Sequence, residues 1–310
     1  MTQYDVAIIG GGAAGLSAAL VLSRARRRVL VVDAGSPRNA PAAHLHGYLS
    51  RDGMPPSELL ASGRAEVTGY GGEITAGRVA ALAPLDDGFS VRLADGRHLA
   101  ARRLLVTTGL RDELPDIPGL RERWARDVLH CPYCHGHEVR DRRLGVLGAN
   151  AGAVRYAQIV RQWSDDLVYF ASAGTLTDAE RVQLTARAIG IVEGPIDQLV
   201  IDDDRLHGVR LADGRVVPLD ALFVPPRFVP HDDLLAALGC DAGSDGWTVT
   251  DAAGRTSVPG VWAAGNVVDP RAQLITAAGA GSAAAIAINA DLVDEDVADA
   301  VRACAPAHLP

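Results

Sequence analysis

Lysine is absent from this sequence, so all 30 basic residues of the 310-residue chain are arginines. Its absence excludes a Schiff-base lysine, a pyridoxal-phosphate anchor and the lysine of a phosphate-binding P-loop. Acidic residues number 38, which gives a formal net charge of −8. A chain with this balance is not expected to bind nucleic acid or an anionic membrane as its main ligand.

Long apolar runs are also missing. No stretch approaches the ~20 apolar residues that a membrane-spanning helix needs. The N-terminal region contains Asp5 and no arginine before Arg24, so it lacks the charged flank of a secretory signal. We therefore expect a cytoplasmic protein that does not enter a membrane. Apolar residues make up 48% of the chain and charged residues 22%, and this composition is typical of a globular protein. The length favours two domains.

The first residues have the pattern strand, glycine-rich turn, helix, strand. The turn contains Gly10, Gly12 and Gly15 in the spacing Gly-x-Gly-x-x-Gly. The first glycine permits the turn, the second lets the backbone approach a pyrophosphate, and the third lets helix and strand pack closely. Asp33 closes the second strand, where a carboxylate can accept hydrogen bonds from a ribose. These residues predict a dinucleotide site at a helix N-terminus.

A second copy of this pattern begins midway along the chain. In this copy Gly148 is the first glycine of the pattern, and Asn150 stands where the second glycine belongs. The side chain of Asn150 would obstruct a pyrophosphate. Ala171 occupies the position equivalent to Asp33, and no arginine follows that strand until Arg181. An alignment shifted by one or two residues is the alternative. We expect the fold of a nicotinamide-nucleotide domain in which NADPH binding is doubtful.

The domain organisation follows from the two copies and the end of the chain. The pentapeptide Leu-Ala-Asp-Gly-Arg stands at 93–97 and again at 211–215, as expected of two similar domains; chance repetition of a hairpin turn is the alternative. The C-terminal region offers one strand and a helix over about 272–292, too little for a domain. We predict an α/β protein with two Rossmann-like nucleotide-binding domains, the second inserted in the first. The predicted boundaries are 1–116 and 245–310 for the first domain, and 117–244 for the insert.

The segment Cys131-Pro-Tyr-Cys134-His135 has three interpretations. CxxCH is the attachment pattern of a c-type haem, which requires an exported, oxidising setting. With His130 and His137, the segment also offers zinc ligands, although it is more compact than a structural zinc site with two separated ligand pairs. The third interpretation is a redox-active dithiol, the usual meaning of CxxC beside βαβ units in the cytosol. We favour the dithiol and expect no metal.

His135 is the candidate acid/base, because a proton must move whenever a thiol becomes a nucleophile and imidazole titrates in the right range. The alternative is that His135 only caps a helix or orders the loop. His137 is a weaker candidate for the same role. Cys240 and Cys304 have no close partner in the sequence and are expected to be incidental thiols.

These features together resemble the low-molecular-weight thioredoxin reductases. The resemblance rests on the N-terminal fingerprint, Thr107-Thr108-Gly109 at a strand end, the CxxC, and the segment 260–266 followed by Gln273. In that family the first domain holds FAD, and residues equivalent to 264–266 and the glutamine contact the flavin. Two positions depart from the family: Asn266 replaces an aspartate, and His135-Gly136 replaces Asp-Gly after the CxxC.

Three further segments resemble one branch of that family, the flavin-dependent dithiol oxidases that close disulfides in natural products such as gliotoxin and holomycin. They are Pro37-Arg38-Asn39, His44-x-His46-Gly47 and the Cys-Pro-Tyr-Cys-His-Gly segment. Electrons in this branch can pass from a dithiol through flavin to oxygen, so a degraded nicotinamide site is tolerated. The resemblance implies a homodimer and an FAD site formed by Gly10, Gly12, Ala13, Ala14, Gly15, Asp33, Arg38, Asn39, His46, Thr108, Gly109, Gly265, Asn266, Gln273 and Leu274. For His46, the role of an ordinary loop histidine is the alternative.

We therefore expect an FAD-dependent disulfide oxidoreductase with Cys131, Cys134 and His135 as its catalytic residues. Our first hypothesis is oxidation of a small-molecule dithiol, with oxygen as the final acceptor. The second is NADPH-dependent reduction of a thioredoxin-like protein or a low-molecular-weight disulfide. The third is a flavin redox sensor without turnover.

Overall fold

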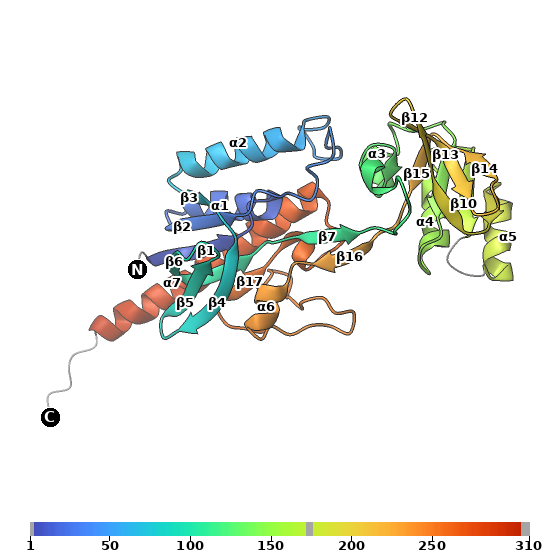
Figure 1. Cartoon of the computed structure of the whole chain (residues 1–310). Coiled ribbons are helices and arrows are strands. Elements are labelled where there is room, and N and C mark those ends of the chain that lie inside the picture. Colours follow the sequence, from blue (N-terminus) through green and yellow to red (C-terminus); the bar gives the residue numbers. More distant parts are fainter. Residues whose placement is uncertain (1–2, 172–175, 305–310) are drawn as a thin grey trace.

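A computed structural model describes residues 3–171 and 176–304 of the chain. Two lobes are joined by a pair of antiparallel strands, β7 (Leu110–Glu113) and β16 (Arg227–Pro230) (Figure 1). Each lobe contains parallel strands flanked by helices, and the chain leaves the first lobe through β7 and returns to it through β16. The predicted fold of two Rossmann-like domains, one inserted in the other, is confirmed.

The first lobe contains a seven-stranded sheet. Its strand order is β3-β2-β1-β6-β5-β4, and β17 pairs with β6. β17 follows the insert in the chain and lies parallel to β6, so the C-terminal region completes the first sheet. The strands are β1 (Gln3–Ile9), β2 (Val29–Asp33), β3 (Glu73–Ala76), β4 (Val79–Leu85), β5 (Gly88–Leu93), β6 (His98–Val106) and β17 (Val261–Ala263).

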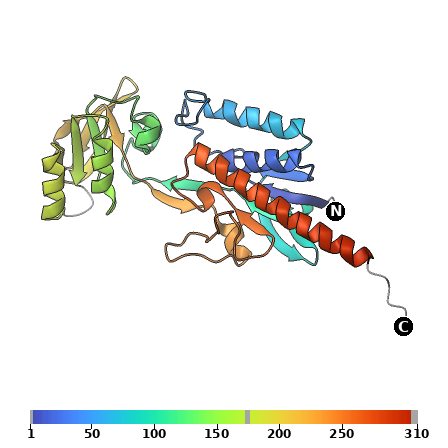
Figure 2. The ribbon, with the colours of Figure 1, turned by 180° about the vertical axis from the view of Figure 1, so that it is seen from behind.

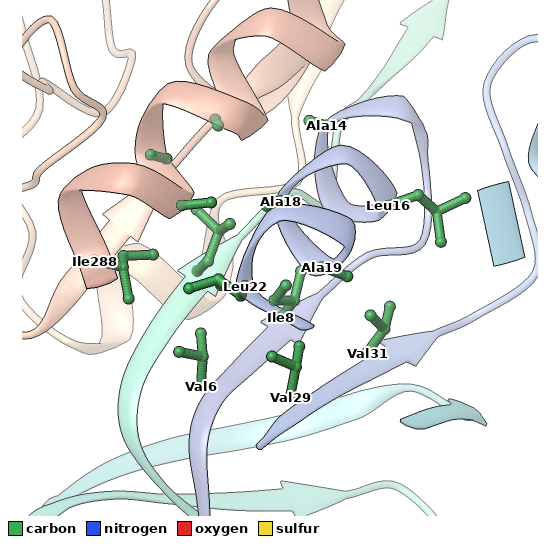
Figure 3. Close-up of a cluster of buried hydrophobic side chains, with 14 of the residues drawn as sticks. Val6, Ile8, Ala14, Leu16, Ala18, Ala19, Leu22, Val29, Val31 and Ile288 are labelled. Atoms are coloured by element: carbon green, nitrogen blue, oxygen red, sulfur yellow. The ribbon is translucent and has the colours of Figure 1, made fainter. Parts of the chain in front are cut away.

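The core of this lobe forms where α1 (Ala13–Arg24) and α7 (Leu274–Cys304) pack against each other and against the sheet (Figure 3). Val6 on β1 and Leu22 on α1 are buried there together with Ile288 of α7. The second flank of α1 packs against α2 (Pro56–Gly69). This packing fixes the N-terminus of α1, and with it the glycine turn, relative to the sheet.

Helix α7 continues beyond the predicted end near residue 292. No glycine or proline interrupts the sequence from 282 to 304, so nothing ends the helix earlier. Among the described helices, α7 alone has the length and mean hydropathy of a membrane span. One face of α7 is buried against α1, so packing within the lobe accounts for part of that hydropathy. The C-terminal half projects beyond the rest of the lobe (Figures 1 and 2).

The second lobe repeats the parallel arrangement on a smaller scale. Its main sheet has the order β11-β10-β9-β15-β8, and β12, β13 and β14 form an antiparallel sheet beside it. The strands are β8 (Val128–Leu129), β9 (Leu144–Leu147), β10 (Leu167–Ala171), β11 (Gly190–Glu193), β12 (Ile196–Asp202), β13 (Arg205–Leu211), β14 (Val216–Pro218) and β15 (Ala221–Phe223). The helices are α3 (Pro132–His135), α4 (Ala153–Val160) and α5 (Asp178–Ala186).

The repeated Asp-Gly-Arg segments occupy equivalent hairpins in the two lobes. Arg97 donates to Asp95 at 2.8 Å, and Arg215 donates to Asp213 at 2.7 Å. Each arginine also reaches a carbonyl in the preceding segment, that of Ala76 in the first lobe and Glu193 in the second. Equivalent contacts of this kind are expected of a repeated domain and not of a turn that recurs by chance.

The return to the first lobe comes before the expected boundary at 244. Helix α6 (Asp233–Ala237) follows β16 directly. Leu235 of this helix is buried with Val79 and Leu82 of β4, so it belongs to the first core. We therefore propose that the insert ends at β16. The segment after β16 belongs to the first lobe because Leu235 is buried against β4, which the composition of the segment did not indicate.

Candidate functional site

A cavity of about 990 Å³ extends from the glycine turn of the first lobe to the two cysteines of the second. Its size is at the upper end of the usual range for ligand sites. Cys131, Cys134 and His135 line it, and so do all the residues predicted to bind the cofactor except Gly15. The structure therefore brings together residues that lie as far apart in sequence as Gly10 and Leu274.

The glycine turn is open toward this cavity. Gly10 has φ +112°, and a Cβ there would lie 2.4 Å from the carbonyl oxygen of Thr107. A Cβ on Gly12, in contrast, would meet nothing within 4 Å, and Gly12 is the N-cap of α1. This leaves open space at the exposed N–H groups of a helix N-terminus, which is the environment that a pyrophosphate requires.

Gly15 is predicted to contribute to the cofactor site, but it does not itself line the cavity. A Cβ at Gly15 would lie 1.9 Å from the carbonyl oxygen of Gly10. The glycine therefore permits close packing between α1 and the turn, and acts on the cofactor site only through the backbone.

Asp33 lies at the far end of β2 and lines the cavity as predicted. Its carboxylate accepts hydrogen bonds from Arg64 at 2.8 Å and from the amide of Gly35 at 3.2 Å. Burial by itself would raise the pKa of Asp33, but these hydrogen bonds and one from the Gly11 amide lower it. Asp33 is thus held as a carboxylate that can accept from ribose hydroxyls.

Arg38 connects the first lobe to both bridging strands. Its guanidinium donates twice to Asp112 of β7, at 2.6 and 2.8 Å, and lies 5.2 Å from the ring centroid of Phe228 on β16. It also reaches Asn266 at 3.4 Å. Only 10% of the Asp112 side chain is exposed, so this bidentate pair is largely protected from water.

Asn266 and Gln273 belong to the segment that leads into α7. The Asn266 amide donates to the carbonyls of Asp269 and Ala272, at 2.9 and 3.0 Å. A carboxylate has no such donors, so these two hydrogen bonds require asparagine in place of the family's aspartate. Gln273 reaches the dithiol: its Oε1 lies 3.1 Å from Sγ of Cys134 and its Nε2 lies 3.6 Å from Sγ of Cys131.

The two cysteines flank one turn of helix. Cys131 is the N-cap of α3, and its sulfur accepts a hydrogen bond from the Cys134 amide at 3.2 Å. Hydrogen bonds from the Cys134 thiol, from Gln273 and from backbone amides lower the pKa of Cys131 to about 6, although burial opposes this. The pKa of Cys134 is raised, because its proton is shared with the neighbouring Cys131 sulfur and because it is buried. In the dithiol, Cys131 is therefore the thiolate and Cys134 the thiol.

Two histidines stand beside the dithiol. Burial lowers the pKa of His135, while Glu138 opposes the shift. Burial also lowers the pKa of His130 to about 4; its ring packs against Phe228, and its carbonyl accepts from the Tyr156 hydroxyl. Both rings are therefore neutral at pH 7, and the low pKa makes His130 a weak base. Within the described ranges, no three histidine, cysteine or acidic side chains come together as a metal site.

His46 links the loop between β2 and α2 to the segment after the dithiol. Its Nδ1 lies 3.2 Å from Asp52 in the same loop, and its Nε2 lies 3.6 Å from Glu138 in the second lobe. Figures 1 and 2 both show this loop facing α3. His46 thus contacts both lobes at the edge of the cavity, which the sequence alone did not indicate.

The side chain of Asn150 closes the second glycine turn. Oδ1 of Asn150 accepts from the amide of Gly152 at 3.0 Å, which uses a donor that a pyrophosphate would otherwise contact. Ala171 ends β10 without a polar side chain, and Arg181 pairs with Glu193 at 2.5 Å. The segment 172–175 lies outside the described residues. These contacts are those expected if the second fold has lost its nucleotide chemistry.

The model of the pyridine nucleotide-disulphide oxidoreductase family matches residues 4–282, which is most of the chain. The chain belongs to this family. Thioredoxin reductase sirT of Leptosphaeria maculans is 29% identical over 95% of this chain and 96% of its own, and thioredoxin reductase tcpT of Claviceps purpurea is 32% identical over 84% and 86%. The crystal structure of HlmI superposes with a TM-score of 0.96 at 60% identity over 98% of both chains.

Membership of the pyridine nucleotide-disulphide oxidoreductases makes this chain a thioredoxin reductase-like, FAD-dependent disulfide oxidoreductase. The residues that line the cavity also fit FAD, independently of the family. The open face of Gly12 and the carboxylate of Asp33 suit an adenosine diphosphate, and the dithiol with Gln273 stands at the opposite end for the flavin ring.

Several residues of the site escaped the sequence analysis. Arg64, Asp112 and Phe228 each contact a predicted residue, but they lie on elements whose sequences carry no motif. The sequence offered one indication, and only for Asp112: it is a polar residue shortly after the end of a strand in the first sheet, where ligand-binding residues often lie. The pairing of β7 with β16, which joins the two lobes, could not be placed without the fold.

Proposed function

We propose that this enzyme oxidises a small-molecule dithiol to a disulfide through Cys131 and Cys134, with oxygen as final electron acceptor. The observation that carries the proposal is the second glycine turn, where Asn150 bonds to Gly152 and no acidic residue ends β10. An enzyme with this turn has a flavin site and a dithiol but a poor site for NADPH. Electrons must then enter through the dithiol.

The thiols would act in a fixed order. A substrate thiolate attacks Sγ of Cys131 in the oxidised pair, the S–S bond breaks, and Cys134 leaves with the electron pair. The raised pKa of Cys134 favours its uptake of a proton at this step. The second substrate thiol then attacks the substrate sulfur of the mixed disulfide. Cys131 is the better leaving group in that step because its pKa is low.

His135 would accept the proton that the second substrate thiol loses. The ring lines the cavity beside the dithiol and is neutral because burial lowers its pKa. A neutral imidazole is the form that can act as a base.

Bound FAD supplies the two-electron acceptor for the dithiol and, in this proposal, the reaction with oxygen. Over the whole cycle the substrate loses two electrons and two protons and becomes a disulfide. Oxygen gains both and becomes hydrogen peroxide. Gln273, which contacts both sulfurs from the first lobe, would hold them in line with the ring.

Anaerobic titration of the purified enzyme tests this proposal. A dithiol should bleach the flavin stoichiometrically, and admission of oxygen should restore the colour with formation of peroxide. NADPH and NADH should bleach the flavin slowly and incompletely. Rapid bleaching by low-micromolar NADPH would instead favour reduction of a thioredoxin-like protein, which the names of the relatives support. Bleaching by neither would favour a sensor.

We also propose that the enzyme is a homodimer that works in the cytoplasm. The support for the dimer is the apolar stripe of α7, a row of exposed side chains on the projecting helix: Ile275, Ile286, Val293, Val297 and Val301. They lie on one side of the helix, so a second copy of the same helix could cover them in an isologous interface. The support for the compartment is that Cys240 and Cys304 are free thiols.

A further inference from the structure

An exposed aromatic side chain stands between the two cysteines. Tyr133 lines the cavity with Cys131 and Cys134, and yet 69% of its surface is exposed. Burial of a large aromatic surface of this kind is a main source of affinity for ligands. An exposed aromatic residue within a redox motif therefore points to a partner that covers it.

The ring of Trp163 supports the ring of Tyr133. The two rings meet edge to face, with centroids 5.7 Å apart and an interplanar angle of 85°. Trp163 can lie against α3 only because residue 136 is glycine: a Cβ there would come within 2.7 Å of the indole. The tyrosine is thus a supported surface with few conformations to lose when a ligand binds.

A second exposed apolar side chain lies on the facing loop. Leu49 is 83% exposed, and it belongs to the loop between β2 and α2. His46 of that loop approaches Glu138, three residues after His135, so the loop is fixed against the α3 region. Leu49 itself does not line the cavity, whereas Tyr133 does.

We propose that Tyr133 selects the substrate, and that the class of substrate is a small dithiol carrying a flat apolar ring. The ring would rest on Tyr133 while one of its thiols reaches Cys131. This inference rests on the proposed function and names the substrate class of the same site. A polar acyclic dithiol would gain little from the tyrosine, whereas a planar ring would bury apolar surface on it.

Two dithiols form a matched pair for the test. Dithiothreitol and 1,2-bis(mercaptomethyl)benzene both close to six-membered cyclic disulfides, but only the second has an aromatic ring. Oxygen uptake gives kcat/KM for each with wild type, Tyr133→Ala, Tyr133→Phe and Tyr70→Ala. Tyr70 is a matched control, a 52% exposed tyrosine bound to Arg24 on the surface of the first lobe.

We expect the preference for the aromatic dithiol, as the ratio of the two kcat/KM values, to fall about tenfold in Tyr133→Ala through a higher KM. Tyr133→Phe should keep the ratio, because the ring face remains, and Tyr70→Ala should change nothing. An unchanged ratio in Tyr133→Ala would overturn the inference.

Failure of the proposed function has a different signature, since wild type would then consume no oxygen with either dithiol. In that case binding still tests Tyr133. The S-methylated form of the aromatic dithiol cannot be oxidised to a disulfide, and its calorimetric Kd should be about tenfold weaker for Tyr133→Ala than for wild type. Equal affinity for both proteins would contradict the inference.

Discussion

The proposed chemistry depends on how one proton is divided between the sulfurs of Cys131 and Cys134. Cys131 receives hydrogen bonds from its partner thiol, from Gln273 and from the backbone, whereas Cys134 keeps the proton in a buried position. Both sulfurs line the same cavity, so the asymmetry comes from hydrogen bonding and not from exposure alone.

We predict that Cys131 is alkylated first when the reduced protein meets iodoacetamide. Only the thiolate reacts, and the pKa of about 6 means that the rate should rise with pH through that value and reach a plateau near neutrality. Mass spectrometry of quenched samples gives the rate at each cysteine. Cys240 is the internal control, because burial raises the pKa of its thiol and should delay its reaction. Equal rates at Cys131 and Cys134 would contradict the asymmetry.

The roles of the two cysteines should separate on mutation. Cys131→Ser removes the neighbouring sulfur that is the largest cause of the raised pKa of Cys134. We expect this variant, with FAD bound, to show a long-wavelength charge-transfer band from the Cys134 thiolate but no dithiol turnover. Cys134→Ser should lack the band. Absorption spectra at pH 8 make the comparison, and the reverse pattern would exchange the two assignments.

His135→Ala should slow dithiol turnover by roughly 10- to 1000-fold if this ring carries the proton. His137→Ala is the matched control, an adjacent histidine whose change should have a much smaller effect. Steady-state oxygen uptake measures both. Comparable losses in the two variants would assign the effect to the loop and not to proton transfer.

At the scale of the elements, the close approach of α1 and α7 positions the pyrophosphate-binding turn. A Cβ at Gly281 of α7 would lie 2.0 Å from the carbonyl oxygen of Ala14, which lines the cavity. Backbone atoms cannot move aside without shifting the whole of α1. The small-residue sequence of α7 is thus a requirement of packing.

We predict opposite effects for two glycines of α7. Gly281→Ala should lower the free energy of unfolding by roughly 1–3 kcal/mol, because the new methyl group overpacks the helix contact. Gly279→Ala is the matched control: nothing lies within 4 Å of its Cβ position, and the higher helix propensity of alanine should raise stability by about 1 kcal/mol. Urea denaturation of the purified proteins gives both values. A neutral Gly281→Ala would contradict the close packing.

The whole molecule consists of two lobes held at a fixed relation by few contacts. Arg38 joins the first lobe to both bridging strands, and His46 reaches the second lobe at Glu138. In this arrangement the dithiol faces the cavity. Under the proposed function NADPH is not exchanged, and turnover would then not require the arrangement to open.

We predict that the apolar stripe of α7 governs assembly. Ile286→Glu should convert a dimer to a monomer, because a buried charge in the centre of an isologous interface occurs twice. Light scattering after size-exclusion chromatography measures the mass. Val182→Glu, on an exposed face of α5, is the matched control and should remain dimeric. A wild-type mass of one chain, 32.4 kDa, would exclude the dimer.

Much of this protein is determined by local sequence. The βαβ pattern, the glycine turn and Asp33 depend on neighbouring residues, and β1, α1 and β2 form where the sequence predicted them. The CxxC fixes its own geometry in the same way, because one helical turn separates its sulfurs. The degraded second turn was also visible, since Asn150 replaces a glycine.

Only the tertiary structure decided the rest, because those features join segments far apart in the chain. The pairing of Arg38 with Asp112, the contact of Gln273 with both thiols and the place of α6 on the first core arise from long-range packing, which no local pattern encodes. The division of the proton between Cys131 and Cys134 is in large part local, because the hydrogen bond between the two sulfurs is its largest cause. The contact of Gln273 with Cys131 is not local, and it exists only once both lobes have folded and docked.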